Sequence, residues 1–243
     1  MSRATQNLVL LLVGLSTALM VAKGSYVYYV KPTLLPWLIT AAVVLVALAI
    51  TAIVRDLRRH GATADADHAG HQHRNWMVWL LVIPIALTAF VVPPPLGSHG
   101  AAPAITADSE PQRVAWPPLP PGESPTVSLP EVLMRSATDS TGSLDGRPIT
   151  TTGFTIKAGD SADLGRVVIV CCAADAQLAR IHLTGPAATT AAELPDGTWL
   201  QIRGHVDTGT SPTRESDTAN KFIPTMAVSS VERIDKPANT YAY

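Results

Sequence analysis

The chain has 243 residues, a formal net charge of −1 at neutral pH and only two cysteines. This balance of charge argues against a nucleic-acid-binding protein and against a strongly basic protein of membrane surfaces, and two cysteines are too few for a disulfide framework. Hydrophobic residues make up 47% of the sequence and charged residues 15%. The longest apolar runs lie before residue 93, and a polar, proline-rich sequence follows them.

Three apolar runs predict three transmembrane helices, at residues 7–30, 34–54 and 76–92. The second run is uncharged and long enough to cross about 30 Å of hydrocarbon as a helix. The third run is shorter, and Pro84 is expected to kink it. The first run also has the length of a signal-peptide core behind Arg3, but no clear cleavage site follows it. The remaining alternative is a buried helix pair, for which so short a chain offers little covering protein.

Positive charges predict the orientation of these helices. The loop between the second and third runs is rich in arginine, whereas the loop between the first and second has only Lys23 and Lys31. The arginines are Arg55, Arg58, Arg59 and Arg74. Because short loops rich in Lys and Arg stay in the cytoplasm, we expect a multi-pass plasma-membrane protein with a cytoplasmic N-terminus. Everything after Val92 is then expected outside the cytoplasm.

The sequence after the third run predicts a linker followed by a β domain. Residues 93–130 are dense in proline, which favours extended polyproline geometry and predicts a semi-rigid extracytoplasmic spacer. A short helix is expected within residues 128–139. From residue 131 onward we expect an extracytoplasmic all-β domain.

Five apolar or alternating segments separated by glycine-rich breaks predict the strands of this domain. They lie at residues 147–156, 165–172, 178–185, 197–206 and 222–234. Their order is most like a small OB-like barrel, with a bulge or tight bend at Gly153–Phe154. Barrels of this kind often bind nucleic acid, but this one has more acidic than basic residues and few aromatic ones for stacking. We therefore expect no nucleic-acid partner.

Histidines in the loop after the second run form a first candidate metal site. Imidazoles and carboxylates suit Zn²⁺ and other divalent transition metals, and histidine-rich tracts are a compositional signal for metal. The loop has no thiol and no rigid scaffold, so weak binding or a merely solvated loop are the two interpretations. The histidines are His60, His68, His71 and His73, with Asp65 and Asp67 between them.

The adjacent pair Cys171–Cys172, followed by Asp175, is the second candidate site. In a regular strand consecutive side chains point to opposite faces, so both thiols can bind one metal ion only if the strand ends there in a turn. Asp175 is the expected further ligand, with His182 as a tentative fourth. Buried or inertly bridged cysteines and thiol redox chemistry remain alternatives, although a vicinal disulfide is strained. We expect no catalytic residues, because no nucleophile–base pair or phosphate-binding loop is apparent.

The chain resembles the bacterial YcgQ-like proteins, a domain-of-unknown-function family described as subunits of a two-component membrane permease. The resemblance is carried by "YVYYVKP" after the first run, "CCAADA", "WLQIRG" and a terminal "PANTYAY". It implies pairing with a polytopic membrane permease and no established substrate. The histidine loop is sparser and the linker richer in proline than that pattern.

Together these features predict a non-enzymatic accessory subunit of a membrane permease complex, lying in the lipid bilayer. Small residues of the first run are expected to allow close contact with the permease. They are Gly14, Ser16, Ala18 and Gly24. The alternative is a membrane-anchored protein that binds Zn²⁺ or another transition metal, or carries out thiol redox chemistry, through Cys171 and Cys172.

Overall fold

The computed structural model describes residues 3–60, 96–97, 102–103, 113–207 and 223–242. The chain divides into two compact units, Met1–Pro94 and Pro95–Tyr243. Each unit is built from its own secondary structure and is described separately below.

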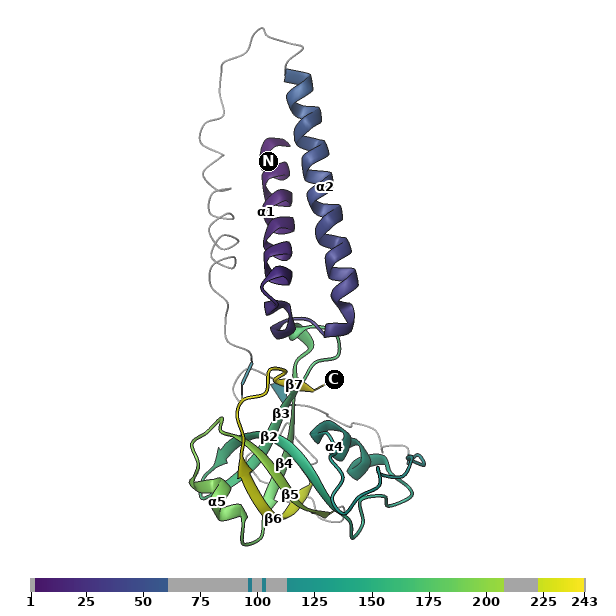
Figure 1. Ribbon diagram of the computed structural model, residues 1–243, viewed down its shortest axis with the longest axis vertical. Helices are drawn as coiled ribbons and strands as arrows, with labels where there is room; N and C mark the ends of the chain where they lie inside the picture. The colour runs from purple at the N-terminus through teal and green to yellow at the C-terminus, as the bar shows by residue number, and fades with distance from the viewer. Residues whose placement is uncertain (1–2, 61–95, 98–101, 104–112, 208–222, 243) are drawn as a thin grey trace. The chain divides into compact units, whose positions relative to one another are not determined.

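The first unit contains a helical hairpin (Figure 1). Helix α1 spans Arg3–Ala22 and helix α2 spans Leu35–His60, and two 3₁₀ turns, η1 at Ser25–Tyr28 and η2 at Pro32–Leu34, join them. Gly24 ends the first helix, because its φ of 71° is a left-handed conformation that glycine adopts without strain.

The described residues contain one helix that is long and apolar enough to cross a membrane, so the prediction of three is wrong. That helix covers Pro32–Arg55, with a mean hydropathy of 2.7. The apolar part of α1, Gln6–Ala22, rises about 25 Å at 1.5 Å per residue, short of a full bilayer core. The break at Gly24 thus cuts the predicted first span of residues 7–30. The predicted third span, 76–92, lies outside the described residues.

Small residues bring α1 and α2 together. Gly14 of α1 is buried, as are Ala42 and Ala49 of α2. A Cβ atom added at Gly14 would lie 2.8 Å from a Cγ2 atom of Val46, closer than packed carbons approach. Gly14, predicted as a contact for a permease, therefore packs within the chain, whereas Ala18 is exposed.

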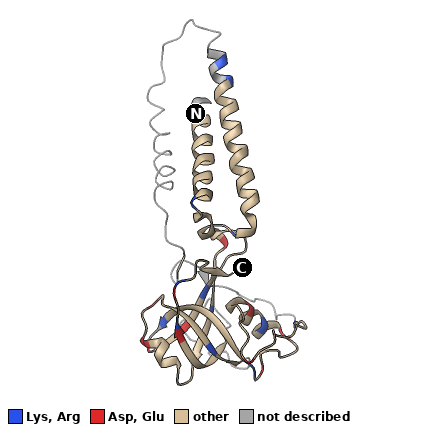
Figure 2. Ribbon diagram, viewed as in Figure 1, with Lys and Arg blue, Asp and Glu red and all other residues tan. Residues whose placement is uncertain are grey.

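The outer surface of the hairpin is apolar. Trp37 is 73% exposed and Val43 62% exposed, and further large apolar side chains of both helices share this exposure. Figure 2 shows both helices largely free of charge along their length, with Lys and Arg gathered at the C-terminal end of α2. A helix that exposes apolar side chains in this way is suited to lipid or to other apolar helices.

The second unit is built on a mixed sheet, with helices α4, Leu129–Thr138, and α5, Ala188–Glu193, packed against it. The five long strands overlap the predicted segments, but β3 begins and ends four residues before its predicted segment of 165–172. They are β2 Pro148–Ala158, β3 Ser161–Val168, β4 Gln177–Thr184, β5 Trp199–Asp207 and β6 Thr225–Arg233. Two short strands, β1 Ala102–Pro103 and β7 Tyr241–Ala242, add to the edges.

The seven strands form one sheet in the order β1-β4-β6-β5-β2-β3-β7, and β3 also pairs with β4. The long neighbours are antiparallel except for β4 and β6, while β1 and β7 join parallel to β4 and β3. At Gly153 the register is regular, and the pairing of β2 passes from β5 to β3 at Phe154, which pairs with both strands. The bulge lies instead at Arg203/Gly204 of β5.

The predicted fold class is therefore corrected in both parts. In place of three spans and a small all-β, OB-like barrel, the described residues contain one spanning helix and a mixed seven-stranded sheet with two helices. The strands follow from local alternation of side chains. The parallel edge strands are only two residues long, and the six residues of α5 are mostly Ala and Thr, so neither leaves a periodic signal in the sequence.

The described part of the proline-rich segment packs against α4 and the strands of the second unit, to which it belongs. Leu119 and Val127 are buried with the inner face of α4, in the same apolar cluster as the strands. Arg135 of α4 is 4% exposed and donates to the carbonyl of Pro117 at 2.8 Å, and its guanidinium stacks 4.8 Å from the ring of Trp116. Residues 113–130 are thus part of the domain structure.

Candidate metal centre

Cys171 and Cys172 lie in a turn that follows β3. The strand ends at Val168, the backbone of Ile169 still donates to Ala242 of β7 at 3.2 Å, and a 3₁₀ turn at Ala173–Asp175 then leads into β4. The thiols are consequently free of the alternation that would place them on opposite faces of a strand. The condition that both side chains converge on one side is met.

The carboxylate of Asp175 holds this turn in place. Its Oδ1 accepts the N–H of Val170 at 2.7 Å, and its Oδ2 accepts the N–H groups of Cys171 at 2.8 Å and Cys172 at 3.2 Å. Three backbone donors that have no partner in a strand are thereby satisfied. This explains why an acid stands three residues after the second cysteine.

The two sulfur atoms lie 3.7 Å apart, and both cysteines are free thiols. A disulfide would bring them to about 2.05 Å. Two sulfurs bound to one tetrahedral Zn²⁺ at about 2.3 Å each would lie about 3.8 Å apart. The Sγ atoms and a carboxylate oxygen of Asp175 all lie within 4.8 Å of one another, so these three residues could hold a metal ion.

Hydrogen bonding sets the protonation of the group. The thiol of Cys171 donates to the Asp175 carboxylate and is also hydrogen-bonded to Cys172, and these contacts raise the pKa of Cys171 to about 11. The same thiol hydrogen bond, with the backbone donors, lowers the pKa of Asp175 to about 2. Without a metal ion, the turn therefore pairs the ionised carboxylate of Asp175 with the protonated thiol of Cys171. A thiol with so high a pKa carries little thiolate at neutral pH and is a weak nucleophile.

His182, predicted as a tentative fourth ligand, is placed elsewhere. It lies on β4 about 17 Å along the strand from Gln177, where β4 begins. Its Nδ1 is 2.7 Å from Oδ1 of Asp163 on β3, and Asp163 also pairs with Arg180. Since the carboxylate is 1% exposed, the pair is part of the packed structure of the sheet.

The histidine loop is largely outside the described residues. His60 is the last residue of α2. The other three, His68, His71 and His73, lie outside the described residues, and the weak site predicted there stays a prediction.

The edges beside the cysteine turn come from remote parts of the chain. Ala102 of β1 pairs with Gln177 just after the turn, and Ala242 of β7 pairs with Val168 just before it. The buried ring of Tyr241 anchors β7, and its hydroxyl accepts the N–H of Leu96 at 2.8 Å. The terminal "NTYAY" contributes to the family resemblance, but no local sequence pattern indicates its place beside the thiols.

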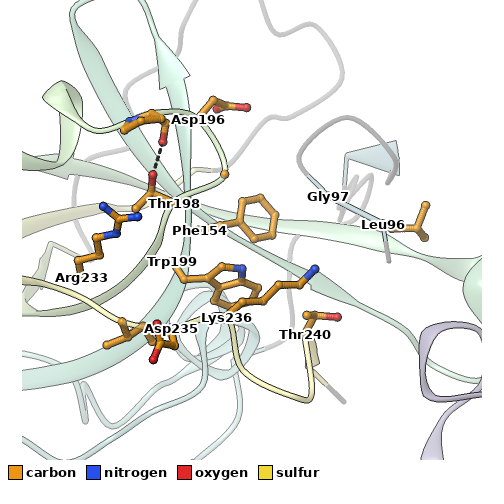
Figure 3. A pocket seen from close by; sticks show the side chains of 13 residues that line it. Leu96, Gly97, Phe154, Asp196, Thr198, Trp199, Arg233, Asp235, Lys236 and Thr240 are labelled. Atoms are coloured by element: carbon orange, nitrogen blue, oxygen red, sulfur yellow. Dashed lines mark hydrogen bonds between the residues drawn. The ribbon is translucent and has the colours of Figure 1, made fainter. Parts of the chain in front are cut away.

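A cleft of about 550 Å³ opens elsewhere on the second unit (Figure 3). Phe154 and Trp199 line it as an edge-to-face pair, with ring centroids 5.6 Å apart. Both rings are less than 10% exposed. Arg233, Asp235 and Lys236 supply charges of both signs at the cleft. No local sequence pattern marks this cleft, because its residues come from separate strands and loops.

The two units define a class of protein in which an apolar helical hairpin accompanies a β domain that carries a thiol–carboxylate turn. Residues 6–102 match the DUF1980 N-terminal domain and residues 132–243 match the DUF1980 C-terminal domain. The chain therefore belongs to the DUF1980 family, a domain of unknown function. No curated protein and no solved structure matches the chain.

Proposed function

We propose that this chain is a membrane-anchored metal-binding protein whose Cys171, Cys172 and Asp175 bind Zn²⁺. The observation that carries this proposal is the sulfur separation of 3.7 Å, close to that of two thiolates on one tetrahedral Zn²⁺. The carboxylate is already ionised and within reach. Helix α2 supplies the anchor, since it is long and apolar enough to cross a bilayer.

Zn²⁺ fits this donor set better than copper(I) or magnesium. Two thiolates and a carboxylate match the mixed soft and hard ligands that Zn²⁺ accepts. Copper(I) selects soft sulfur donors alone, and Mg²⁺ prefers oxygen atoms and water. Binding would release the protons of both thiols, including the one that Cys171 donates to Asp175, because a metal ligand must be deprotonated.

The test is metal analysis of the full-length protein, purified reduced and without oxygen in mild detergent. We expect one Zn²⁺ per chain, which the double variant Cys171→Ser, Cys172→Ser loses. The matched control replaces His60, His68, His71 and His73 with Ala, and this variant should keep the ion. Wild-type protein without stoichiometric Zn²⁺, or a double serine variant that retains it, would overturn the proposal.

A second function, an accessory subunit of a membrane permease complex such as the YcgQ-like pairing implies, is favoured by the exposed apolar surface of α2. Val43 and Leu48 are both more than half exposed after α1 has packed against the helix. Apolar helix surfaces in membranes contact either lipid or other helices. A polytopic permease would cover part of this surface, and the two functions are compatible.

Site-specific photo-crosslinking in the native membrane tests this second function. A photoreactive residue at Val43 or Leu48 should yield a discrete adduct with a polytopic protein. The same residue at Val13, an exposed position of α1, serves as a comparison. If α2 positions give adducts with lipid alone, the chain does not use this surface for a permease.

A further inference from the structure

The vicinal cysteine turn presents too few protein ligands to enclose a metal ion. Among the described residues the group consists of Cys171, Cys172 and Asp175, with no fourth His, Cys, Asp or Glu. Structural Zn²⁺ sites have four protein ligands, whereas sites with three leave a position for water or an incoming group. The number of donors therefore distinguishes a structural ion from an exchangeable one.

Asp175 cannot fill the fourth position by binding through both oxygens. Its Oδ2 already accepts two N–H groups and its Oδ1 accepts one. A carboxylate offers about four acceptor positions, so about one remains for the ion once the Cys171 thiol has lost its proton. The carboxylate then binds through a single oxygen while it holds the turn, and the described residues leave one coordination position open.

The open position is accessible from outside the domain. Cys171 is exposed and Cys172 half-buried, and Val170 beside them is 67% exposed. Since no described side chain encloses the thiols, a donor group on a second molecule can reach the ion. The exposed Val170 would lie at the edge of such a contact.

The net charge of the metal-bound site determines which kind of fourth ligand it favours. Two thiolates and one carboxylate carry three negative charges, so the site with Zn²⁺ bound carries one net negative charge. An anionic fourth ligand is repelled, whereas a neutral imidazole is not. We infer that the Cys171–Cys172–Asp175 centre is an open site that takes the neutral imidazole of a partner's histidine as its fourth ligand. This inference rests on the proposed function.

Cobalt(II) replaces Zn²⁺ in the experiment, because its visible spectrum reports the number and type of ligands. Full-length protein with His60, His68, His71 and His73 replaced by Ala is loaded with Co²⁺ without oxygen and titrated with imidazole, then separately with azide. We expect a saturable change at one imidazole per ion, while the sulfur-to-cobalt absorption persists. Raising the concentration of sodium perchlorate, which coordinates poorly, should leave the imidazole affinity unchanged and tighten azide binding about twofold to fivefold as screening grows.

The outcomes separate this inference from the proposed function. If Co²⁺ does not bind, the metal-binding function fails, and the inference fails with it. If Co²⁺ binds through sulfur but imidazole leaves the spectrum unchanged, the site is closed and only the inference is overturned. Azide affinity that is insensitive to salt would overturn the charge argument for a neutral ligand.

Discussion

His182 is bound to Asp163 across two neighbouring strands, with 2.7 Å between Nδ1 of the imidazole and Oδ1 of the carboxylate. The two residues are directly paired in the register of β3 and β4. Arg180 completes the group from the same side of β4. The histidine thus partners a buried carboxylate and is separate from the cysteine turn.

Replacement of His182 with Phe should destabilise the second unit without affecting metal content. Asp163 would keep Arg180 but lose one hydrogen bond in a buried site, which costs roughly 1–3 kcal/mol. Thermal unfolding and metal analysis of the same preparation measure the two effects. The matched control is His205→Phe at an exposed position of β5, which should change stability little. Loss of Zn²⁺ from a folded His182 variant would contradict this assignment.

Arg135 should be a main stabilising residue between α4 and the proline-rich segment. It donates to Glu131 at 2.9 Å, and to the carbonyl of Pro117 and the hydroxyl of Ser143, each at 2.8 Å. Arg135→Met would leave these acceptors unpaired, and we expect a loss of roughly 2–4 kcal/mol in the free energy of unfolding. Urea titration measures it.

Arg203→Met provides the control for this experiment. Arg203 is exposed, and its guanidinium lies 3.9 Å from the carboxylate of Glu123. Surface pairs of this kind contribute between about 0 and 1 kcal/mol. Equal effects of the two substitutions would show that the buried network is unimportant.

Gly14→Leu should disrupt the packing of α1 against α2. Even a Cβ at this position would lie 2.8 Å from a methyl carbon of Val46 and 3.2 Å from the Val46 backbone nitrogen. Overpacking of this kind costs typically 1–3 kcal/mol. Thermal unfolding in detergent should show a lower midpoint for Gly14→Leu than for Ala18→Leu, whose position is exposed. The opposite order would place the close helix contact at Ala18.

The stability of the α4 C-terminus should depend on pH through Asp139. Partial burial raises the pKa of Asp139, but hydrogen bonds from Ser143 and Thr141 outweigh it and hold the pKa well below its usual range. A depressed folded-state pKa stabilises the protein above the unfolded value, near 3.9, and this contribution is lost as the pH falls below it. Wild-type protein should therefore lose stability between about pH 4 and pH 2 more steeply than Asp139→Asn. If the stabilities of the two proteins fell in parallel with pH, Asp139 would not be the source of the pH dependence.

Local sequence patterns predicted the strands and helix α4, because alternation and proline at a helix start act over a few residues. They also predicted the apolar character of α2 and marked Cys171, Cys172 and Asp175 as one group. They failed to predict the end of helix α1, because that end depends on the backbone torsion of a single residue. Gly24 ends α1 early, and an apolar run that reads as one span becomes a shorter helix followed by 3₁₀ turns.

Residue types and short spacings were determined by the sequence itself, including the acid three residues after the second thiol. Only the tertiary structure decided where β3 ends, that Asp163 holds His182, and that Gly14 contacts α2. These features depend on contacts between residues far apart in the chain. Such contacts depend on strand register and helix packing. Both are fixed by the burial of whole faces of strands and helices, which happens only when all the elements pack together.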